Sequence, residues 1–356
     1  MNQSTTSTTS DQTFRRPVSL KPYKTDVAVL LIFFNRPSTF RRVFEEVKKA
    51  RPSHLFLYQD GARGERDVAG VEACRAICAD AEIDWQCEVS RLYQEKNFGC
   101  DPSEYLSQKW AFSKVDRCIV LEDDDVPSQS FFPFCKELLD RYADDSRVWM
   151  ISGFNTDEVT PGVSADYFFT SVFSIWGWAS WRRVVDTWDA GYSWLDSPED
   201  VQRIERLIKD RGYFKGFIDE CRRHRATGVP YYETVFWASM LLNNGLAAMP
   251  VKNQINNIGL TTDATHYQAS FKTMPRRLRR MFTMKRFELD FPLHHPHFVM
   301  ENTAYKESVY RAYALNHPWI KVGRSLEELA YNLRYGHFDV IGKAIANRVK
   351  KTVGLK

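Results

Sequence analysis

The chain has 356 residues, of which 44% are hydrophobic and 26% charged, and its formal net charge at pH 7 is +4. These proportions exclude a disordered or fibrous chain and are typical of a globular protein with one large domain or two ordinary ones. No stretch approaches the roughly 20 apolar residues that span a bilayer, and the Ser/Thr-rich segment 1–13 lacks the apolar core of a signal peptide. Seven cysteines without a Cys-x-x-Cys pair indicate a reducing compartment and no zinc site. We therefore expect a cytoplasmic protein.

Strands and helices are predicted to alternate over residues 27–121. Short runs rich in apolar residues predict strands over residues 27–33, 54–59, 88–93 and 118–121. Between them, the spacing of apolar residues predicts a helix that begins near Pro37 and two more over residues 68–81 and 102–113. Repeated strand–helix units with short loops are typical of a mostly parallel sheet with right-handed crossovers, so the predicted fold class is α/β.

Four adjacent acids, Glu122 to Asp125, follow directly after the fourth predicted strand. Their carboxylates repel one another unless something neutralises them, and a bound Mg²⁺ or Mn²⁺ with open positions for substrate phosphates would do so. A solvated acidic turn or a helix N-terminus is the alternative. The position after a buried strand favours a ligand site, because ligands of open α/β sheets bind beyond the carboxyl ends of the strands.

Polar groups also follow the other predicted strands: Asn35 and Arg36 after the first, Asp60 after the second and Asn97 after the third. Because the carboxyl ends of parallel strands meet at one edge of a sheet, these side chains are expected to line one nucleotide-binding site. The chain has neither the Gly-x-Gly-x-x-Gly fingerprint of dinucleotide-binding proteins nor a Walker A sequence. A nicotinamide or flavin cofactor is therefore disfavoured.

An ordered series of motifs extends over roughly residues 25–300. The motifs are Phe33-Phe34-Asn35-Arg36-Pro37, Asn97-Phe98-Gly99, Val120-Leu121-Glu122-Asp123-Asp124, Ile175-Trp176-Gly177-Trp178-Ala179-Ser180-Trp181, Asn243-Asn244-Gly245, Asn257-Ile258-Gly259, Asp263-Ala264-Thr265-His266 and Pro292-Leu293-His294-His295-Pro296. Together they resemble the GT-A fold glycosyltransferases, in particular bacterial relatives of N-acetylglucosaminyltransferase I.

The resemblance implies a Rossmann-like GT-A catalytic domain over residues 25–300, with a mostly parallel central sheet flanked by helices. A disordered tail, residues 1–24, would precede it, and a basic helical extension, residues 301–356, would follow. The implied activity is transfer of a hexose or N-acetylhexosamine from a nucleotide-diphospho-sugar donor, with Mn²⁺ or Mg²⁺ as cofactor. The implied acceptor is a hydroxyl of a glycan or lipid-linked glycan, as in bacterial polysaccharide or lipopolysaccharide synthesis.

The motif positions imply metal and sugar ligands. Asp124 is the implied metal ligand and His266 a second one, although a lone His is as often a surface residue. Glu122 and Asp123 would lie against the ribose and sugar of the donor. Asp125 stands where relatives usually carry a non-acidic residue, so which of the last three acids touches the ion stays open.

The resemblance also implies residues that bind the nucleotide. Asp60 would contact a nucleobase edge, while Asn35 and Arg36 would flank the base and the diphosphate. Arg36 can pair with phosphate oxygens as a bidentate fork. Asn97, in the loop after the third strand, would belong to the same donor site.

Glu233 occupies the place where relatives carry an acid before Asn-Asn-Gly, which implies a general base for the acceptor hydroxyl. We expect Tyr231 and Tyr232 to desolvate it partly, which would raise its pKa toward a useful value. A single base of this kind predicts inversion at the anomeric carbon. The alternative is a carboxylate at the first turn of a helix over residues 235–242.

The Trp-rich segment is expected to form part of the sugar site. Gly177 would let the backbone approach a ligand closely, and the indole of Trp176 suits the C–H face of a pyranose. Trp181 is expected to be structural. Alternatively, Trp178 and Trp181 are core residues spaced three apart on a helix.

Two basic segments near the C-terminus, residues 272–286 and 342–356, interleave Lys and Arg with apolar residues. Such segments are typical of contact with an anionic membrane surface or a phosphorylated lipid acceptor, which would make the protein peripheral at the inner face of the cytoplasmic membrane. A solvated charged face is the alternative. Nucleic-acid binding is disfavoured, because the net charge is small and no nucleic-acid-binding module is recognised.

Two other functional classes stay open. A sugar-phosphate nucleotidyltransferase would share the sheet and the acidic site, but it usually has a Gly-rich phosphate loop near its N-terminus, which this sequence lacks. A non-catalytic carbohydrate-binding protein would account for the ten Trp residues but not for the clustered carboxylates.

Overall fold

The computed structural model describes residues 20–260 and 271–353. Most of the predicted N-terminal tail and the predicted metal ligand His266 lie outside these ranges, so both stay predictions. The predicted basic segment 272–286 is described throughout. The second one, residues 342–356, is described except for its last three residues.

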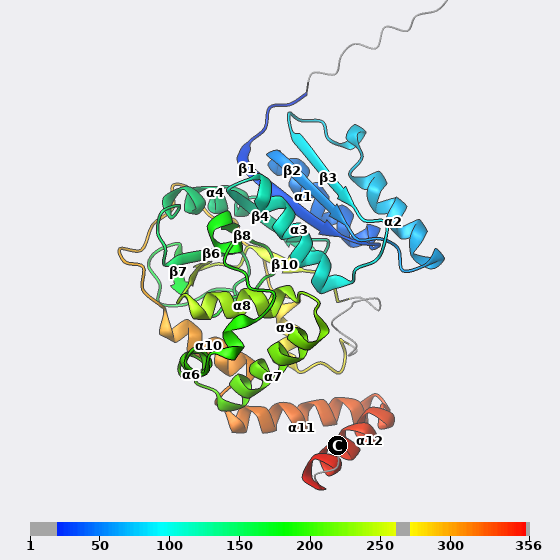
Figure 1. The fold of residues 1–356 in the computed structure, drawn as a ribbon, viewed down its shortest axis with the longest axis vertical. Helices are drawn as coiled ribbons and strands as arrows, with labels where there is room; N and C mark the ends of the chain where they lie inside the picture. The colour runs from blue at the N-terminus through cyan, green and yellow to red at the C-terminus, as the bar shows by residue number, and fades with distance from the viewer. Residues whose placement is uncertain (1–19, 261–270, 354–356) are drawn as a thin grey trace, which may run out of the picture.

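An eight-stranded mixed sheet with the strand order β3-β2-β1-β4-β8-β6-β9-β7 forms the centre of the molecule (Figure 1). Its first four strands are parallel, as predicted, whereas β8 runs antiparallel to both β4 and β6. Further along, β9 is parallel to β6 and antiparallel to β7. The strands are β1 Thr25–Phe33, β2 Pro52–Gln59, β3 Glu88–Tyr93, β4 Arg117–Glu122, β6 Val148–Ser152, β7 Tyr167–Thr170, β8 Trp178–Trp181 and β9 Leu246–Pro250.

Helices α1 (Pro37–Ala50), α2 (Glu65–Ile77) and α3 (Cys100–Lys114) connect the parallel strands. In α1 the buried apolar side chains recur every three or four residues, and Pro37 stands in the first turn, where a missing N–H costs nothing. Helix α2 begins three residues before the predicted start and ends four residues before the predicted end. A short 3₁₀ turn, Asp80–Glu82, overlaps the last two residues of that predicted helix.

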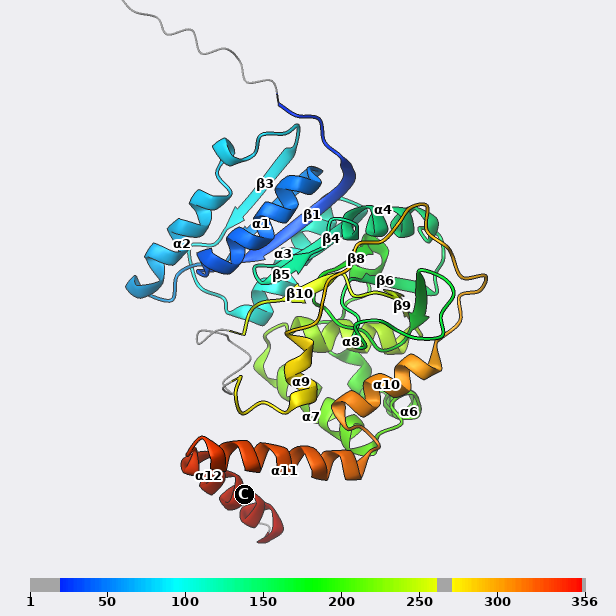
Figure 2. The ribbon, with the colours of Figure 1, turned by 180° about the vertical axis from the view of Figure 1, so that it is seen from behind.

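The remaining helices are α4 Phe131–Arg141, α5 Arg182–Val185, α6 Pro198–Leu207, α7 Arg211–Thr227, α8 Tyr232–Leu242, α9 Arg276–Met281, α10 Thr303–Tyr313, α11 Pro318–Arg334 and α12 Phe338–Val353, with a 3₁₀ turn over Ser193–Asp196. Of these helices, α4 packs on the face of the sheet to which Trp181 points and α8 on the face to which Trp178 points. Both views place α11 and α12 beyond the other helices, at the end of the molecule far from β1 to β3 (Figures 1 and 2). Among the described residues, no helix combines the length and apolarity that crossing a bilayer requires.

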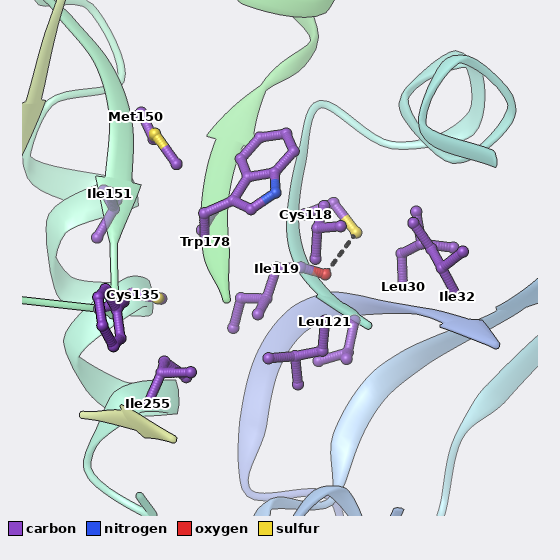
Figure 3. Packing of buried hydrophobic residues seen from close by; sticks show 14 of the residues in the cluster. Leu30, Ile32, Cys118, Ile119, Leu121, Cys135, Met150, Ile151, Trp178 and Ile255 are labelled. Atoms are coloured by element: carbon purple, nitrogen blue, oxygen red, sulfur yellow. Dashed lines mark hydrogen bonds between the residues drawn. The ribbon is translucent and has the colours of Figure 1, made fainter. Parts of the chain in front are cut away.

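The core is packed by side chains from β1, β4, β6, β8 and α4 (Figure 3). Trp178 and Trp181 are core residues, as the alternative predicted, but they belong to strand β8, so the helix that it predicted for them is wrong. Residues three apart in a strand point to opposite faces, and both indoles are buried because elements pack on both sides of β8. The indole N–H of Trp181 donates to the carbonyl of Leu139, 3.1 Å away, which agrees with the expected structural role.

A second, two-stranded sheet pairs β5 (Asp125–Pro127) with β10 (Ile255–Asn257) in antiparallel register. The pairing sets Asn257 opposite Asp125. Gly177 lies against this small sheet with φ +62, and a Cβ built there would stand 2.5 Å from Cδ1 of Ile255. The backbone before β8 can pass β10 at this distance because residue 177 has no side chain.

We expect Gly177→Ala to destabilise the protein by about 2–4 kcal/mol, because it combines the strain of a left-handed residue with overlap against Ile255. Gly162→Ala is the matched control, since Gly162 also has a positive φ but no heavy atom within 4 Å of the built Cβ. That control should cost only about 1 kcal/mol. Urea unfolding measures both, and equal losses in the two variants would contradict the overlap at residue 177.

Candidate functional site

A cavity of about 870 Å³ opens at the carboxyl ends of β1, β2 and β4, a volume suited to a small-molecule ligand. It brings together six side chains that the sequence predicted for the donor site: Asn35, Arg36, Asp60, Asn97, Glu122 and Asp123. These residues come from four segments that follow different strands, and the parallel sheet is what joins them at one edge.

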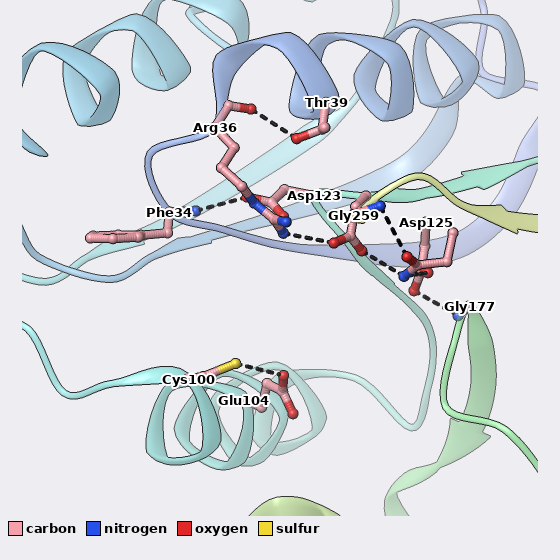
Figure 4. A network of polar contacts seen from close by, with 11 residues as sticks. Phe34, Arg36, Thr39, Cys100, Glu104, Asp123, Asp125, Gly177 and Gly259 are labelled. Carbon is pink, nitrogen blue, oxygen red and sulfur yellow. Dashed lines mark hydrogen bonds and ion pairs between the residues drawn. The ribbon is translucent and has the colours of Figure 1, made fainter. Parts of the chain in front are cut away.

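The acidic run lies at the end of β4 and in the turn to β5, with Asp123, Asp124 and Asp125 all buried. The guanidinium of Arg36 forms an ion pair with Asp123 and donates to Oδ2 of Asp124 at 2.8 Å (Figure 4). The backbone N–H of Phe34 donates to Asp123 at 3.4 Å. The loop after β1 thus supplies the positive charge that faces the carboxylates of β4.

Burial dominates the ionisation of these acids. It raises the pKa of Asp123 to about 6, although the charge of Arg36 opposes the shift. Burial and the neighbouring carboxylates hold the pKa values of Glu122 and Asp125 well above their usual range. Burial lowers the pKa of Arg36, but Asp123 and Asp124 outweigh it and raise that pKa overall. The site therefore gathers more carboxyl groups than one guanidinium keeps ionised.

Asp125 has a bonding pattern that sets it apart from the other acids. Its carboxylate accepts from the backbone N–H of Gly177 at 2.9 Å and from Nδ2 of Asn257 at 3.1 Å. The same amide donates to Oδ1 of Asp124 at 2.9 Å. Asp125, the first residue of β5, thus joins β5 to β10 and to the segment before β8, whereas Asp123 and Asp124 contact Arg36. Of these three acids, only Asp123 lines the cavity.

The donor set at Arg36 fits a hard divalent cation in its chemistry. Asp123 and Asp124 both direct an oxygen at one guanidinium, and carboxylate oxygens are the ligands that Mg²⁺ and Mn²⁺ prefer, usually with water and substrate phosphates beside them. Within residues 20–260 and 271–353, no group of three or more His, Cys, Asp or Glu side chains is arranged to hold a metal ion. A cation here would thus have few protein ligands among the described residues.

Asp60 fixes the loop that follows β3. Its carboxylate accepts from Nδ2 of Asn97 at 2.8 Å and from the backbone N–H groups of Gly61, Phe98 and Gly99 at 2.9, 2.9 and 3.0 Å. Burial raises its pKa, and these hydrogen bonds oppose the shift. Both oxygens are occupied by the protein, so contact between Asp60 and a nucleobase stays a prediction.

Asn35 and Trp176 are each held by neighbouring side chains. Nδ2 of Asn35 donates to Asp67 on α2 at 2.8 Å, which orients its amide at the cavity wall. The half-buried ring of Trp176 packs edge-on against Phe154 and tilted against Phe282, with centroids 4.7 and 5.1 Å apart. Neither Trp176 nor its neighbour Gly177 lines the cavity, so their contact with a sugar stays a prediction.

Glu233 is exposed in the first turn of α8, and the expected partial desolvation of its carboxylate stays a prediction. Successive helical residues point in different directions: Tyr232 enters the core, while Tyr231 stacks on His224 with ring centroids 3.6 Å apart. The charge of Glu233 nevertheless reaches the site, because it helps to raise the pKa of Glu104. Its role as a general base is untested.

Glu104, on α3, is a site residue that the sequence analysis missed. It is 5% exposed and lines the cavity, and Sγ of Cys100 donates to its carboxylate at 3.4 Å (Figure 4). Burial and the charge of Glu233 hold its pKa well above the usual range. The buried face of α3 is largely polar, so apolar periodicity carries no signal for this position.

Comparison with known proteins does not identify a function for this chain. No protein-family model matches the chain, and no curated protein matches its sequence. Among solved structures, a UDP-glucose pyrophosphorylase complexed with UDP-glucose is similar over 46% of this chain and 78% of its own, at 9% sequence identity and a TM-score of 0.29. A similarity this weak carries over neither an activity nor a ligand.

We expect Glu104→Gln to stabilise the protein, and increasingly so as the pH rises. The folded state holds the proton of Glu104 above the usual carboxyl pKa of 4.5, so ionisation costs stability from about that pH upward. Each pKa unit corresponds to about 1.4 kcal/mol, and the neutral amide avoids this cost.

Melting temperatures between mildly acidic and mildly alkaline pH measure the effect. Glu72→Gln is the control, because Glu72 is exposed on α2 and should show no pH-dependent gain. A constant difference between Glu104→Gln and the wild type at every pH would contradict the raised pKa of Glu104.

Proposed function

We propose that the chain is a glycosyltransferase that moves a sugar from a nucleotide-diphospho-sugar donor to a hydroxyl of a glycan or lipid-linked glycan. The observation that carries the proposal is the cavity at the sheet edge, where an arginine and a group of buried carboxylates meet polar side chains from three other strand ends. The ordered motifs that resemble GT-A glycosyltransferases support it.

In the proposed donor complex, Arg36 contacts the diphosphate and the loop fixed by Asp60 forms the wall beside the base. Arg63 also lines the cavity, so a second guanidinium stands near the negatively charged donor. A divalent cation held by Asp123 and Asp124, with His266 as an additional ligand, would neutralise charge on the leaving nucleoside diphosphate. Glu122 and Asp123 then contact the ribose and sugar, and Trp176 and Gly177 complete the sugar side.

For the transfer step we propose Glu233 as the general base. Its carboxylate takes the proton of the acceptor hydroxyl while that oxygen attacks the anomeric carbon and the bond to the nucleoside diphosphate breaks. The exposed position of Glu233 is compatible with an acceptor that arrives from solvent. A single displacement of this kind gives a product with inverted anomeric configuration.

Donor binding is tested by thermal unfolding with UDP, GDP, CDP and dTDP sugars, each with and without Mn²⁺. One nucleotide class should stabilise the protein by about 2.7 kcal/mol at 100 times its dissociation constant, and more with Mn²⁺. Asp123→Asn should lose this gain, because it removes charge that faces Arg36 and the cation.

Asp219→Asn, at an exposed acid on α7, is the matched control and should keep the full stabilisation. If no nucleotide sugar stabilises the wild type, or if Asp123→Asn responds as the wild type does, the proposed donor site is wrong. The released product distinguishes the enzyme classes, since a nucleotidyltransferase would release or consume pyrophosphate and a glycosyltransferase releases a nucleoside diphosphate.

Glu233→Gln should lower kcat by about 10²- to 10⁴-fold while the donor affinity stays unchanged, because a general base acts on the acceptor proton. Glu205→Gln, at an exposed acid on α6, serves as the control. The anomeric configuration of the product, measured by NMR, tests the single displacement. A product that retains the donor's configuration would exclude Glu233 as the base of an inverting reaction.

A further inference from the structure

Helix α11 presents its apolar face to solvent. Its apolar side chains are spaced alternately three and four residues apart, which places them in one stripe along the helix. The stripe consists of Trp319, Val322, Leu326, Leu329 and Leu333, and all five are exposed, Trp319 at 85% and Leu326 at 61%. No residue of α11 is buried.

The opposite, polar face of α11 is turned toward the rest of the protein and contacts α9 and α10 through hydrogen bonds. Oε1 of Glu327 accepts from the backbone N–H of Arg276 at 3.0 Å and from the hydroxyl of Tyr331 at 3.1 Å. Arg324 donates to the carbonyl of Tyr313 at 3.4 Å. This arrangement is the reverse of that in ordinary surface helices, whose apolar stripe faces the core. The exposed stripe therefore indicates that α11 binds a membrane or another apolar surface.

Arginines surround a cavity of about 750 Å³ between α9 and α11. It is lined by Phe271, Arg276, Arg277, Arg279, Arg280, Thr283 and Glu327. Among these, Arg280 pairs with Glu158 at 2.9 Å. The guanidinium of Arg279 lies over the ring of Tyr331, 5.4 Å from its centroid, and that of Arg277 donates to the carbonyl of Arg311 at 3.2 Å. Neither Arg277 nor Arg279 has a carboxylate partner in the part of the chain that the structure describes.

The charge of the chain is strongly asymmetric in sequence. Residues 271–356 contain 17 Lys and Arg against 7 Asp and Glu, a net charge of +10, whereas residues 1–270 carry −6. The stretch 272–286, which includes α9, has no acid at all. The exposed apolar stripe thus belongs to the one strongly basic section of an otherwise acidic chain.

We propose that the exposed face of α11 forms a docking surface for an anionic lipid bilayer. The stripe from Trp319 to Leu333 lies in the bilayer interface, and the arginines of α9, beside α11, attract the anionic headgroups. Charge complementarity favours a bilayer over a second copy of the chain, because a second copy would bring the same positive surface against this one. The surface lies at the end of the molecule far from β1 to β3 (Figure 2).

Flotation of the full chain with lipid vesicles tests the proposal. Vesicles of phosphatidylcholine mixed with phosphatidylglycerol should bind the protein, those of phosphatidylcholine alone should bind it several-fold less, and added salt should weaken binding. Leu326→Asp should lower the affinity for mixed vesicles by about tenfold or more, since it replaces a leucine that would be inserted in the bilayer by a charged residue. Leu326 is exposed, so its replacement leaves the core intact.

Two further variants sharpen the test. Val68→Asp is the matched control, because Val68 is exposed on α2, remote from α11, and should bind vesicles like the wild type. Arg277→Gln should lose part of the preference for phosphatidylglycerol but keep the weak binding to phosphatidylcholine, and an unchanged preference would overturn the role of the α9 arginines in attracting headgroups.

Light scattering separates a bilayer from a second copy of the chain. If the wild type fails to bind mixed vesicles, or if Leu326→Asp binds them as well as the wild type, α11 is not a bilayer-docking surface. A dimer that Leu326→Asp dissociates, without vesicle binding by the wild type, would assign the stripe to a second copy instead. None of these outcomes depends on nucleotide-sugar binding, so they stand apart from the proposed transferase activity.

Discussion

The site depends on a shortage of positive charge around buried carboxylates. Strand β4 ends in a run of acids that the fold encloses, and Arg36 is the guanidinium that contacts two of them. Removing carboxylates from water is costly unless they are paired or protonated, which accounts for the raised pKa of Asp123. The pairing of Arg36 with Asp123 and Asp124 couples the loop after β1 to the end of β4.

The other elements of the site hold Arg36, Asp123 and Asp124 and the surrounding loops in place. Asp60 holds the loop after β3, and Asn257 holds the acids from the far side, through the small sheet of β5 and β10. Glu104 approaches from α3 with a carboxyl that burial keeps hard to ionise. Cation, phosphate and sugar chemistry would thus be confined to a cavity whose walls are held by hydrogen bonds.

Much of the first half of the fold could be predicted from the sequence, because β1, β2 and β4 are continuous apolar runs and α1 has a regular apolar face. The short strands β5 and β10 could not be predicted, since three residues are too few to show a period. Glu104 could not be predicted as a site residue, because the buried face of α3 is polar. The exposure of Glu233 could not be predicted either, because it depends on how the first turn of α8 is oriented. Helix α11 is amphipathic in sequence, but which way its apolar face points is decided by tertiary packing.

The contacts of Asp125 set an order in which the site can be completed during synthesis. Its partners Gly177 and Asn257 lie 52 and 132 residues later in the chain, so the acids of β4 leave the ribosome long before the groups that hold them. Until then these acids must stay hydrated and ionised, and the first half of the sheet has to form around an unfinished edge. The nascent chain therefore contains every residue that lines the cavity, all of them between Ile32 and Asp123, before Asn257 can hold Asp124 and Asp125 from β10.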